Sequence, residues 1–309
     1  MKDICLLVLK KAIRRFLQLI TDFRKINMIE LPKISIIIPT RNRASYLKRG
    51  LNKILESDYP NLEIIVMDGA SSDDTVQVIK SYGHKIAKWV SKLDGGEYDA
   101  LNKGILLSSG EYIMHFTDDD VIIPTSLTSI GQFAARNQQF DIIFGQVNLW
   151  KEINGIPVQY GVTKYLDPNF VKPSKYFRIS PGPPTQGAFV HRRLYDRIGL
   201  HATNYVIGDY EFWGRAIRMG AKCALLPDVV ADYHFTGDNG VITKADKIRK
   251  DYIRIANAYG ANIDKIYIYI QVWKQTLIAL ISNMSHAIGF HPLRWRFNMK
   301  IKNYKRTAN

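Results

Sequence analysis

The chain has 309 residues, of which 46% are hydrophobic and 23% are charged, a composition typical of packed globular proteins and not of disordered ones. This length allows one large α/β domain with appendages or two modest domains. The formal net charge of +15 indicates an anionic partner, such as nucleic acid, anionic lipid or a phosphorylated substrate. Two cysteines, Cys5 and Cys223, are too few for a disulfide framework or a usual zinc site, so we expect a reducing compartment.

The basic residues are dense near both ends of the chain, which favours surface attachment over a basic catalytic groove. Residues 3–26 have the spacing of an amphipathic helix, with apolar side chains such as Leu17 and Ile20 opposite a basic face. This helix can either pack on the domain's own core or lie in the plane of an anionic membrane. The longest apolar stretch, 266–290, is interrupted by Lys274 and is not a clean transmembrane span.

Strand and helix patterns alternate from residue 33 onward. We expect strands at 34–38, 62–67, 85–91 and 112–116, and helices at 44–57, from Asp73 or Asp74 to about Tyr82, and at 96–107. This alternation predicts a parallel sheet with helices on both faces. The pattern then changes to a hairpin of strands 141–150 and 156–160, a short strand at 186–191 and a helix at 210–219.

Polar side chains follow directly on three of the predicted strands. They are Thr40, Asp68 and the Asp118–Asp120 run. Because ligands bind at the carboxyl ends of the strands in such sheets, we expect these side chains to share one site. Adjacent carboxylates raise each other's pKa unless a cation compensates them, and hard oxygen ligands suit Mg²⁺ or Mn²⁺. An Asp-rich run alone favours the alternative of a solvated acidic turn, and the apolar strand that precedes this run weakens that alternative.

Five segments of the chain occur in the order and spacing of one known family. They are Ile36–Arg43, Asp68–Thr75, Asp94–Gly104, Gly110–Ile113 with Thr117–Asp120, and Gly208–Trp213. The chain resembles the family 2 glycosyltransferases over about residues 33–240. The segment Tyr98–Gly104 is most similar to bacterial exopolysaccharide enzymes, such as those of colanic-acid type. The resemblance implies the GT-A fold, which is Rossmann-like, with a mostly parallel sheet and helices on both faces.

The same resemblance implies where the donor nucleotide and its diphosphate bind. The residues implied at the donor are Pro39, Thr40, Asn42, Asp68, Asn102, Lys103 and Asp118. Pro39, Thr40 and Asn42 would border the nucleotide, and Asp68 would contact the base or ribose. Gly69 and Leu101 depart from the family pattern at positions for recognition of the base, and UDP is the expected nucleotide.

The family pattern also implies the metal ligands and the catalytic base. Asp119 would be the direct ligand of Mn²⁺ or Mg²⁺, and His234 a second metal or phosphate ligand. Because Thr117 stands at the first position of the usual Asp-x-Asp motif, the metal pair is either Asp118 with Asp119 or Asp119 with Asp120. Asp209 matches the position of the catalytic base, and a plain helix N-cap is its alternative role.

These residue types fit an inverting sugar transfer. A divalent metal stabilises the charge of the leaving diphosphate, and a carboxylate accepts the proton of the attacking hydroxyl. With one base and direct attack, the anomeric centre inverts. We therefore predict transfer from a nucleotide sugar, expected to be a UDP-sugar, to a saccharide or lipid-linked saccharide acceptor. The expected process is bacterial surface polysaccharide synthesis.

The predicted organisation has three parts: an N-terminal amphipathic helix at 1–30, a GT-A catalytic domain at 31–243, and a basic, helical C-terminal region at 244–309. We expect a cytoplasmic protein that is peripheral on the inner face of the cell membrane. Two alternatives stay open, a metal-dependent nucleotidyltransferase-like enzyme and a non-enzymatic anion-binding protein. Nucleic acid is not an expected partner, because the acidic run would repel phosphates in the absence of a metal.

Overall fold

The computed structural model describes residues 15, 30–153, 156–163, 185–235 and 244–259. The predicted N-terminal helix and the residues after 259 lie outside the described residues, as does the hairpin turn at Asn154-Gly155. The described residues form one nine-stranded sheet in the order β3-β2-β1-β4-β8-β6-β9-β5, with β7 paired to β6.

The elements agree closely with the predicted alternation. The strands are β1 Ile34–Thr40, β2 Leu62–Asp68, β3 Lys88–Ser91, β4 Tyr112–His115, β5 Val121–Ile122, β6 Ile142–Ile153, β7 Ile156–Val162, β8 Ala188–His191 and β9 Cys223–Phe235. The helices are α2 Ala44–Leu55, α3 Thr75–Ser81, α4 Glu97–Leu107, α5 Ser126–Arg136, α7 Arg192–Ile198, α8 Gly208–Arg218 and α10 Ala245–Ala258. Two short 3₁₀ turns, η1 Gly83–Lys85 and η3 Thr185–Gly187, delay the predicted starts of β3 and β8.

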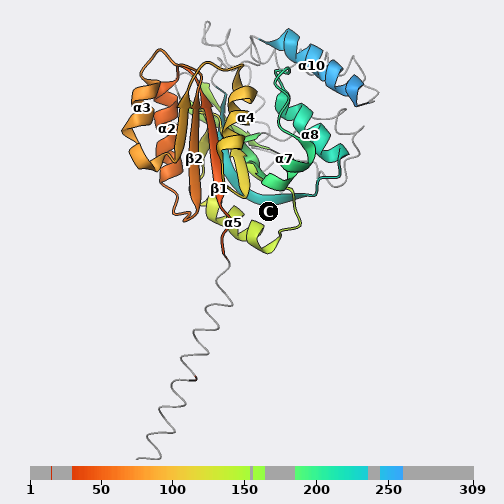
Figure 1. The fold of residues 1–309 in the computed structure, drawn as a ribbon, viewed down its shortest axis with the longest axis horizontal. Helices are drawn as coiled ribbons and strands as arrows, with labels where there is room; N and C mark the ends of the chain where they lie inside the picture. Colours follow the sequence, from red (N-terminus) through yellow and green to blue (C-terminus); the bar gives the residue numbers. More distant parts are fainter. Residues whose placement is uncertain (1–14, 16–29, 154–155, 164–184, 236–243, 260–309) are drawn as a thin grey trace, which may run out of the picture.

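The first half of the sheet is parallel and covered on both faces, as predicted (Figure 1). β1 is a buried apolar run whose side chains alternate between two cores. Ile36 packs in the core that contains Leu51 of α2, and Ile37 packs in the core under α4. α4 approaches the sheet closely, because a Cβ atom on Gly104 would lie only 2.4 Å from Ile37 Cγ2.

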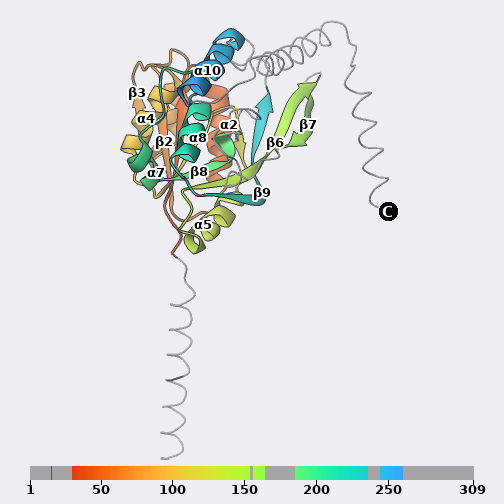
Figure 2. The same cartoon turned by 90° about the vertical axis from the view of Figure 1, so that its right-hand side faces the viewer.

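The second half of the sheet is mixed. β8 is antiparallel to both β4 and β6, whereas β6 and β9 are parallel. The predicted hairpin is present as β6 and β7, and Figure 2 shows it extending from the side of the body beside the end of β9. β5 pairs with β9 in antiparallel register, which brings the residues just before β5 beside the end of β9. This pairing helps to position the acidic run.

α10 packs against α8. The Tyr252 ring meets the Tyr210 ring edge-on, with centroids 4.7 Å apart. The Asp251 carboxylate accepts a 2.6 Å hydrogen bond from the backbone N–H of Val206. The predicted division between residues 243 and 244 stays a prediction, although α10 on its C-terminal side contacts the body. Among the described residues, no helix combines the length and apolar character that crossing a bilayer requires.

Candidate active site

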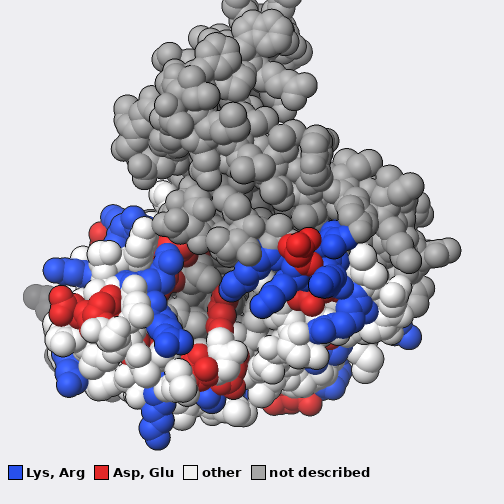
Figure 3. Space-filling model, turned by 90° about the horizontal axis from the view of Figure 1, so that it is seen from above, with Lys and Arg blue, Asp and Glu red and all other residues white. Residues whose placement is uncertain are grey.

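The carboxyl edge of the parallel half brings three of the predicted site positions together. Thr40 and Asp68 end β1 and β2 and lie opposite one another in the parallel register. The Thr40 hydroxyl donates a 2.6 Å hydrogen bond to Asp118 Oδ2, in the loop after β4. Seen from this edge, acidic side chains lie in a hollow with Lys and Arg side chains on either side (Figure 3). The strand ends therefore meet at one site, as the sequence predicts.

Asp118 and Asp119 share one guanidinium, that of Arg43. Arg43 Nε lies 2.6 Å from Asp118 Oδ1, and its Nη2 lies 2.8 Å from Asp119 Oδ2. The guanidinium also lies 4.4 Å from the centroid of the Tyr46 ring, a cation–π contact. Burial raises the pKa of Asp118 to about 6, against the opposing effects of Thr40 and Arg43. Arg43 lies within a segment that carries the family resemblance, but its ion pairs were not predicted.

Asp120 differs from its two neighbours because its side chain is directed into the protein. The residue is fully buried, and one carboxylate oxygen accepts a hydrogen bond from the Thr117 hydroxyl. Gln186 Nε2 in turn donates to Thr117 Oγ1 at 3.3 Å. Burial raises the pKa of Asp120 well above its ordinary value. The structure thus places Asp118 and Asp119 at Arg43, and directs Asp120 to Thr117.

The carboxylate oxygens of this cluster are the kind of ligand that a divalent metal prefers. Among the described residues, no group of three or more His, Cys, Asp or Glu side chains is arranged to hold a metal. Mg²⁺, however, commonly binds through one or two carboxylates and completes its coordination with substrate phosphates and water. Asp118 and Asp119 supply that minimum, and the Asp119 side chain is the more exposed of the two, at 18% against 6%. The pair fits a metal that arrives with a phosphorylated substrate.

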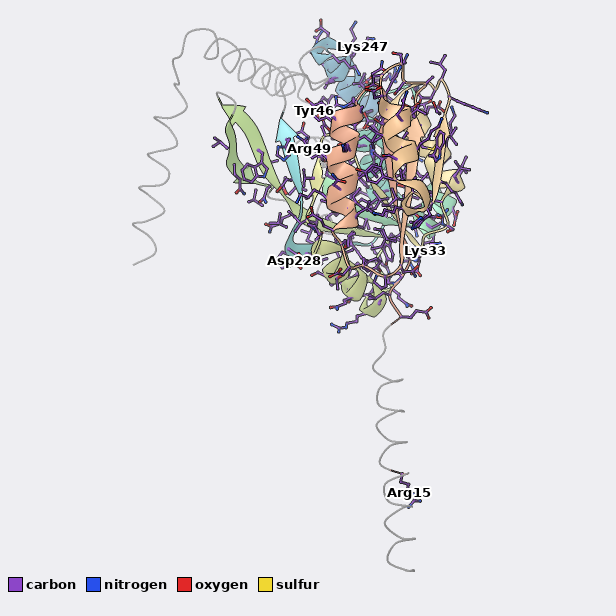
Figure 4. All side chains as sticks on the ribbon, turned by 90° about the vertical axis from the view of Figure 1, so that its left-hand side faces the viewer. Arg15, Lys33, Tyr46, Arg49, Asp228 and Lys247 are labelled. Atoms are coloured by element: carbon purple, nitrogen blue, oxygen red, sulfur yellow. The ribbon has the colours of Figure 1, made fainter. Side chains whose placement is uncertain are left out.

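His234 lies near the acidic cluster, in the last part of β9. Its ring stacks on that of Trp150, with centroids 6.1 Å apart and planes 9° apart. Burial lowers the pKa of His234, nearby Arg49 lowers it further, and nearby Asp119 opposes this. Arg49 Nη2 also donates a 2.8 Å hydrogen bond to the backbone oxygen of Asp119. Figure 4 shows Arg49 and Tyr46 on α2. The side chains of α2 and β9 therefore flank the acidic cluster.

Asp68 and Asn42 hold the loop that lies next to the strand ends. Asp68 is buried and accepts hydrogen bonds from the Ser71 backbone at 3.1 Å and the Ser91 hydroxyl at 2.5 Å. Asn42 adopts φ of 54°, a left-handed conformation that Asn tolerates better than most residues. Its Oδ1 accepts a 2.7 Å hydrogen bond from the Ser72 backbone. Both side chains are thus engaged in shaping the 68–72 loop.

Asn102 and Lys103 of α4 have partners away from the acidic cluster. The Asn102 amide makes two bonds with the backbone of His201, donating at 2.8 Å and accepting at 3.0 Å. Lys103 Nζ lies 2.7 Å from Asp99 Oδ2 on the surface. Asn102 therefore ties α4 to the segment before α8, and Lys103 forms an exposed ion pair.

Asp209 lies in the first turn of α8 and is not its N-cap, because Ile207 occupies that position. The Tyr98 hydroxyl, from α4, donates a 3.0 Å hydrogen bond to Asp209 Oδ1. Burial raises the pKa of Asp209, and Glu97 raises it further, whereas Tyr98 and His115 oppose the rise. Asp209 therefore does not act as the N-cap of α8.

Glu97 connects the two parts of the site. Its Oε1 lies 3.3 Å from His115 Nε2, at the end of β4. The Glu97 side chain is about half exposed, and its partial burial acts to raise its pKa, but His115, Lys244 and Arg43 together hold the pKa below its ordinary value. Glu97 thus lies within electrostatic reach of both Arg43 and Asp209. Glu97, Tyr98 and His115 were not predicted as site residues, although two of them belong to the Asp94–Gly104 segment that carries the family resemblance.

Residues 35–199, more than half of the chain, match the model of the family described as Glycosyl transferase family 2. The chain belongs to this family. A PGL/p-HBAD biosynthesis glycosyltransferase of Mycobacterium tuberculosis is 25% identical over 256 residues, covering 80% of this chain and 93% of the relative. An uncharacterised glycosyltransferase of Rickettsia felis is 29% identical over 201 residues, covering 62% of this chain and 32% of the relative. The chain thus spans about a third of the length of that relative.

Solved structures share the fold at low sequence identity. Staphylococcus aureus TarS 1–349, in complex with UDP-GlcNAc, matches with a TM-score of 0.56 and 18% identity, covering 81% of this chain and 73% of that one. The mannosyltransferase PcManGT from Pyrobaculum calidifontis, in complex with GDP-Man and Mn²⁺, matches with a TM-score of 0.55 and 20% identity, covering 88% and 80%. The predicted GT-A fold is confirmed, and the similarity to colanic-acid enzymes stays a prediction.

Proposed function

We propose that this glycosyltransferase takes a sugar from a nucleotide-sugar donor and transfers it, with inversion, to a hydroxyl of a saccharide or lipid-linked saccharide. The main support is the arrangement of two acidic centres at one sheet edge. Asp118 and Asp119 meet at Arg43, and Asp209 lies on the adjoining side, with Glu97 in electrostatic reach of both parts. Two proteins of the same fold carry UDP-GlcNAc, or GDP-Man with Mn²⁺, in their solved complexes.

Asp118 and Asp119 are the proposed binding residues for Mn²⁺ or Mg²⁺, with Asp119 the direct ligand. Their carboxylate oxygens suit a hard cation, and the Asp119 side chain is the more exposed of the two, whereas Asp120 is fully buried and serves as a support. When bound, the metal stabilises the negative charge that the leaving diphosphate gains. Arg43 forms ion pairs with the same two carboxylates. A guanidinium released from them can pair with phosphate oxygens.

The remaining donor contacts follow from the loop at the strand ends. Thr40 and Pro39 end β1 beside the acidic cluster. Asp68 and Asn42 shape the adjoining 68–72 loop. We assign the nucleotide, expected to be UDP, to the end of β1 and this loop. His234 is near Asp119 and is the proposed second metal or phosphate ligand.

The two predicted donor residues of α4 receive different proposed roles. The Lys103 side chain is 48% exposed, so its ion pair with Asp99 is open to exchange with a phosphate. Asn102 acts indirectly, because both ends of its amide are bonded to the backbone of His201.

Asp209 is the proposed catalytic base. Its carboxylate takes the proton of the acceptor hydroxyl as that oxygen attacks the anomeric carbon. The bond between the anomeric carbon and the diphosphate oxygen breaks on the opposite face, so the configuration inverts. Burial raises the pKa of Asp209, which makes the carboxylate a stronger base while Tyr98 helps to keep it ionised.

The process and location that we propose are bacterial surface polysaccharide synthesis at the inner face of the cell membrane. The support is the basic character of the chain ends, which suits an anionic bilayer surface. Flotation of the full chain with anionic liposomes, and its absence with neutral ones, is the expected result. A full chain that fails to float with either would remove the membrane from the proposal.

The donor proposal is tested by thermal unfolding with UDP-GlcNAc or GDP-Man, each with and without Mn²⁺. We expect one donor to raise the unfolding temperature more when Mn²⁺ is present, and Asp119→Ala to lose the Mn²⁺-dependent part. Asp228→Ala is the matched control, because Asp228 is exposed and lies well apart from Tyr46 and Arg49, the α2 residues beside the acidic cluster (Figure 4). Turnover should release a nucleoside diphosphate. Release of pyrophosphate would instead identify a nucleotidyltransferase and reject this proposal.

A further inference from the structure

Tyr98 is the residue through which α4 contacts the proposed base. Its hydroxyl donates a 3.0 Å hydrogen bond to Asp209 Oδ1, across 111 residues of sequence. Tyr98 is the second residue of α4, and Asp209 is the second residue of α8. This side-chain bond therefore joins the starts of the two helices at the proposed base.

The Tyr98 ring packs against neighbours on several sides, which fixes the position of its hydroxyl oxygen. The ring stacks on His201, with centroids 5.7 Å apart and planes 23° apart, and meets His115 edge-on at 6.2 Å. Gly208, the residue before Asp209, leaves room for it. A Cβ atom on Gly208 would lie 2.9 Å from Tyr98 Cδ2, closer than real contacts allow. The absence of a side chain at Gly208 lets the ring pack against the backbone that carries Asp209.

The charged and titratable groups around Asp209 come from three other elements. α4 contributes Tyr98 and Glu97, β4 contributes His115, and α10 contributes Tyr252. Glu97 acts against the ionised Asp209 carboxylate, and His115 favours it through its charge. Tyr98 is the member of this set whose side chain donates a hydrogen bond to the carboxylate. The backbone N–H of Tyr210, on the base's own helix, donates the other stabilising bond.

We propose that Tyr98 is a positioning residue for the base: its hydroxyl orients the Asp209 carboxylate toward the acceptor and keeps it ionised before each transfer. This inference rests on the proposed function, since it assigns a role relative to Asp209. Because the bond engages the base and no donor contact, its loss should affect the proton-transfer step and leave binding of the nucleotide sugar unchanged. A hydrogen bond to a charged group is among the stronger kinds, so the loss should be measurable.

The test compares Tyr98→Phe with Tyr195→Phe. Tyr195 belongs to the same aromatic group, with its ring centroid 5.8 Å from that of His201, but its hydroxyl faces His201 Nε2 and not Asp209. Each variant loses one hydroxyl from a ring beside His201. Hydrolysis of UDP-GlcNAc and GDP-Man, in which water takes the place of the acceptor hydroxyl, is followed across pH by the release of nucleoside diphosphate. For Tyr98→Phe we expect kcat to fall about tenfold or more, KM for the donor to stay unchanged, and the acid limb of kcat/KM to move to higher pH.

A second measurement needs no turnover. Carboxyl ¹³C NMR of Asp-labelled full chain, with Asp209→Asn used to assign the Asp209 signal, follows the pKa of Asp209 directly. The pKa should rise in Tyr98→Phe and stay at the wild-type value in Tyr195→Phe. An unchanged pKa with unchanged kcat in Tyr98→Phe, or equal losses in both variants, would overturn the role of Tyr98. Full activity of Asp209→Asn would instead reject Asp209 as the base, and with it the proposed function.

Discussion

Two buried carboxylates lie at opposite edges of the same parallel strands, and their surroundings differ. Glu63, near the start of β2, accepts hydrogen bonds from the Ser35 hydroxyl at 2.5 Å and from the backbone and hydroxyl of Ser109 at 2.7 and 2.9 Å. Burial opposes its ionisation, but these bonds hold the pKa of Glu63 below its ordinary value. At the other edge, burial prevails and raises the pKa of Asp118 to about 6.

The difference separates a structural acid from a proposed functional one. The hydrogen bonds to Glu63 already stabilise its negative charge, so an added cation would bring little further stabilisation there. Asp118 lies beside a second carboxylate, Asp119, and the single guanidinium of Arg43 serves both. A carboxylate pair with incomplete compensation is a favourable place for an added cation. Substitutions at the carboxyl edge should therefore mainly reduce turnover, and substitutions at the amino edge should mainly reduce stability.

The largest expected effect is on turnover at the carboxyl edge. Asp209→Asn removes the proposed base while keeping the size of the side chain, so kcat should fall by about 10²–10⁴-fold. The Mn²⁺-dependent thermal shift with the donor should persist, because Asp209 is not assigned to the donor. Nucleoside diphosphate release measures the first quantity and thermal unfolding the second. Glu63→Gln, the matched acid-to-amide change at the amino edge, should keep the wild-type kcat. Equal losses in both variants would contradict the division between the two edges.

The next effect is on stability at the amino edge. Glu63→Gln should lower the free energy of unfolding by about 1–3 kcal/mol, because an amide group cannot accept all the hydrogen bonds that the carboxylate accepts from Ser35 and Ser109. Chemical denaturation at neutral pH measures this difference. Glu56→Gln is the control, since Glu56 pairs with Lys53 on the surface, its one ion pair among the residues described, and should change stability little. Equal stability of the Glu63→Gln protein and the wild type would show that this network is not stabilising.

A smaller effect concerns pH. The pKa of Glu63 is lower in the folded protein than its ordinary value of 4.5, so the unfolded chain binds this proton more readily. The stabilisation by Glu63 is therefore complete above about pH 4.5 and is lost as the pH falls through the lower, folded-state pKa. The stability difference between the wild type and Glu63→Gln should shrink as the pH is lowered through this range. A difference that stays constant down to pH 3 would contradict the lowered pKa.

The sequence predicted the strand ends well because that signal is local. Buried apolar runs such as β1 end in polar residues, and parallel strands place those ends at one edge, which brought Thr40 next to Asp118. The sequence did not separate Asp120 from its neighbours, since the direction of each side chain depends on the turn after β4 and its pairing with β9. Likewise the contact of Tyr98 with Asp209 depends on how α4 and α8 meet, which no local pattern contains.

The smallest expected effect is at Arg43. Its guanidinium partly neutralises Asp118, just as the hydrogen bonds from Ser35 and Ser109 stabilise the charge of Glu63. Arg43→Met should remove this internal cation and leave Asp118 and Asp119 without it. At pH 8, above the pKa of about 6 for Asp118, Mn²⁺ binding without nucleotide should then tighten by about twofold to fivefold, the equivalent of one partly exposed ion pair. The electron paramagnetic resonance signal of free Mn²⁺ measures this affinity. Arg41→Met is the control, because Arg41 is exposed and makes no ion pair with the part of the chain that the structure describes. Weaker Mn²⁺ binding in Arg43→Met would mean that the guanidinium organises the two carboxylates for the metal and does not compete with it.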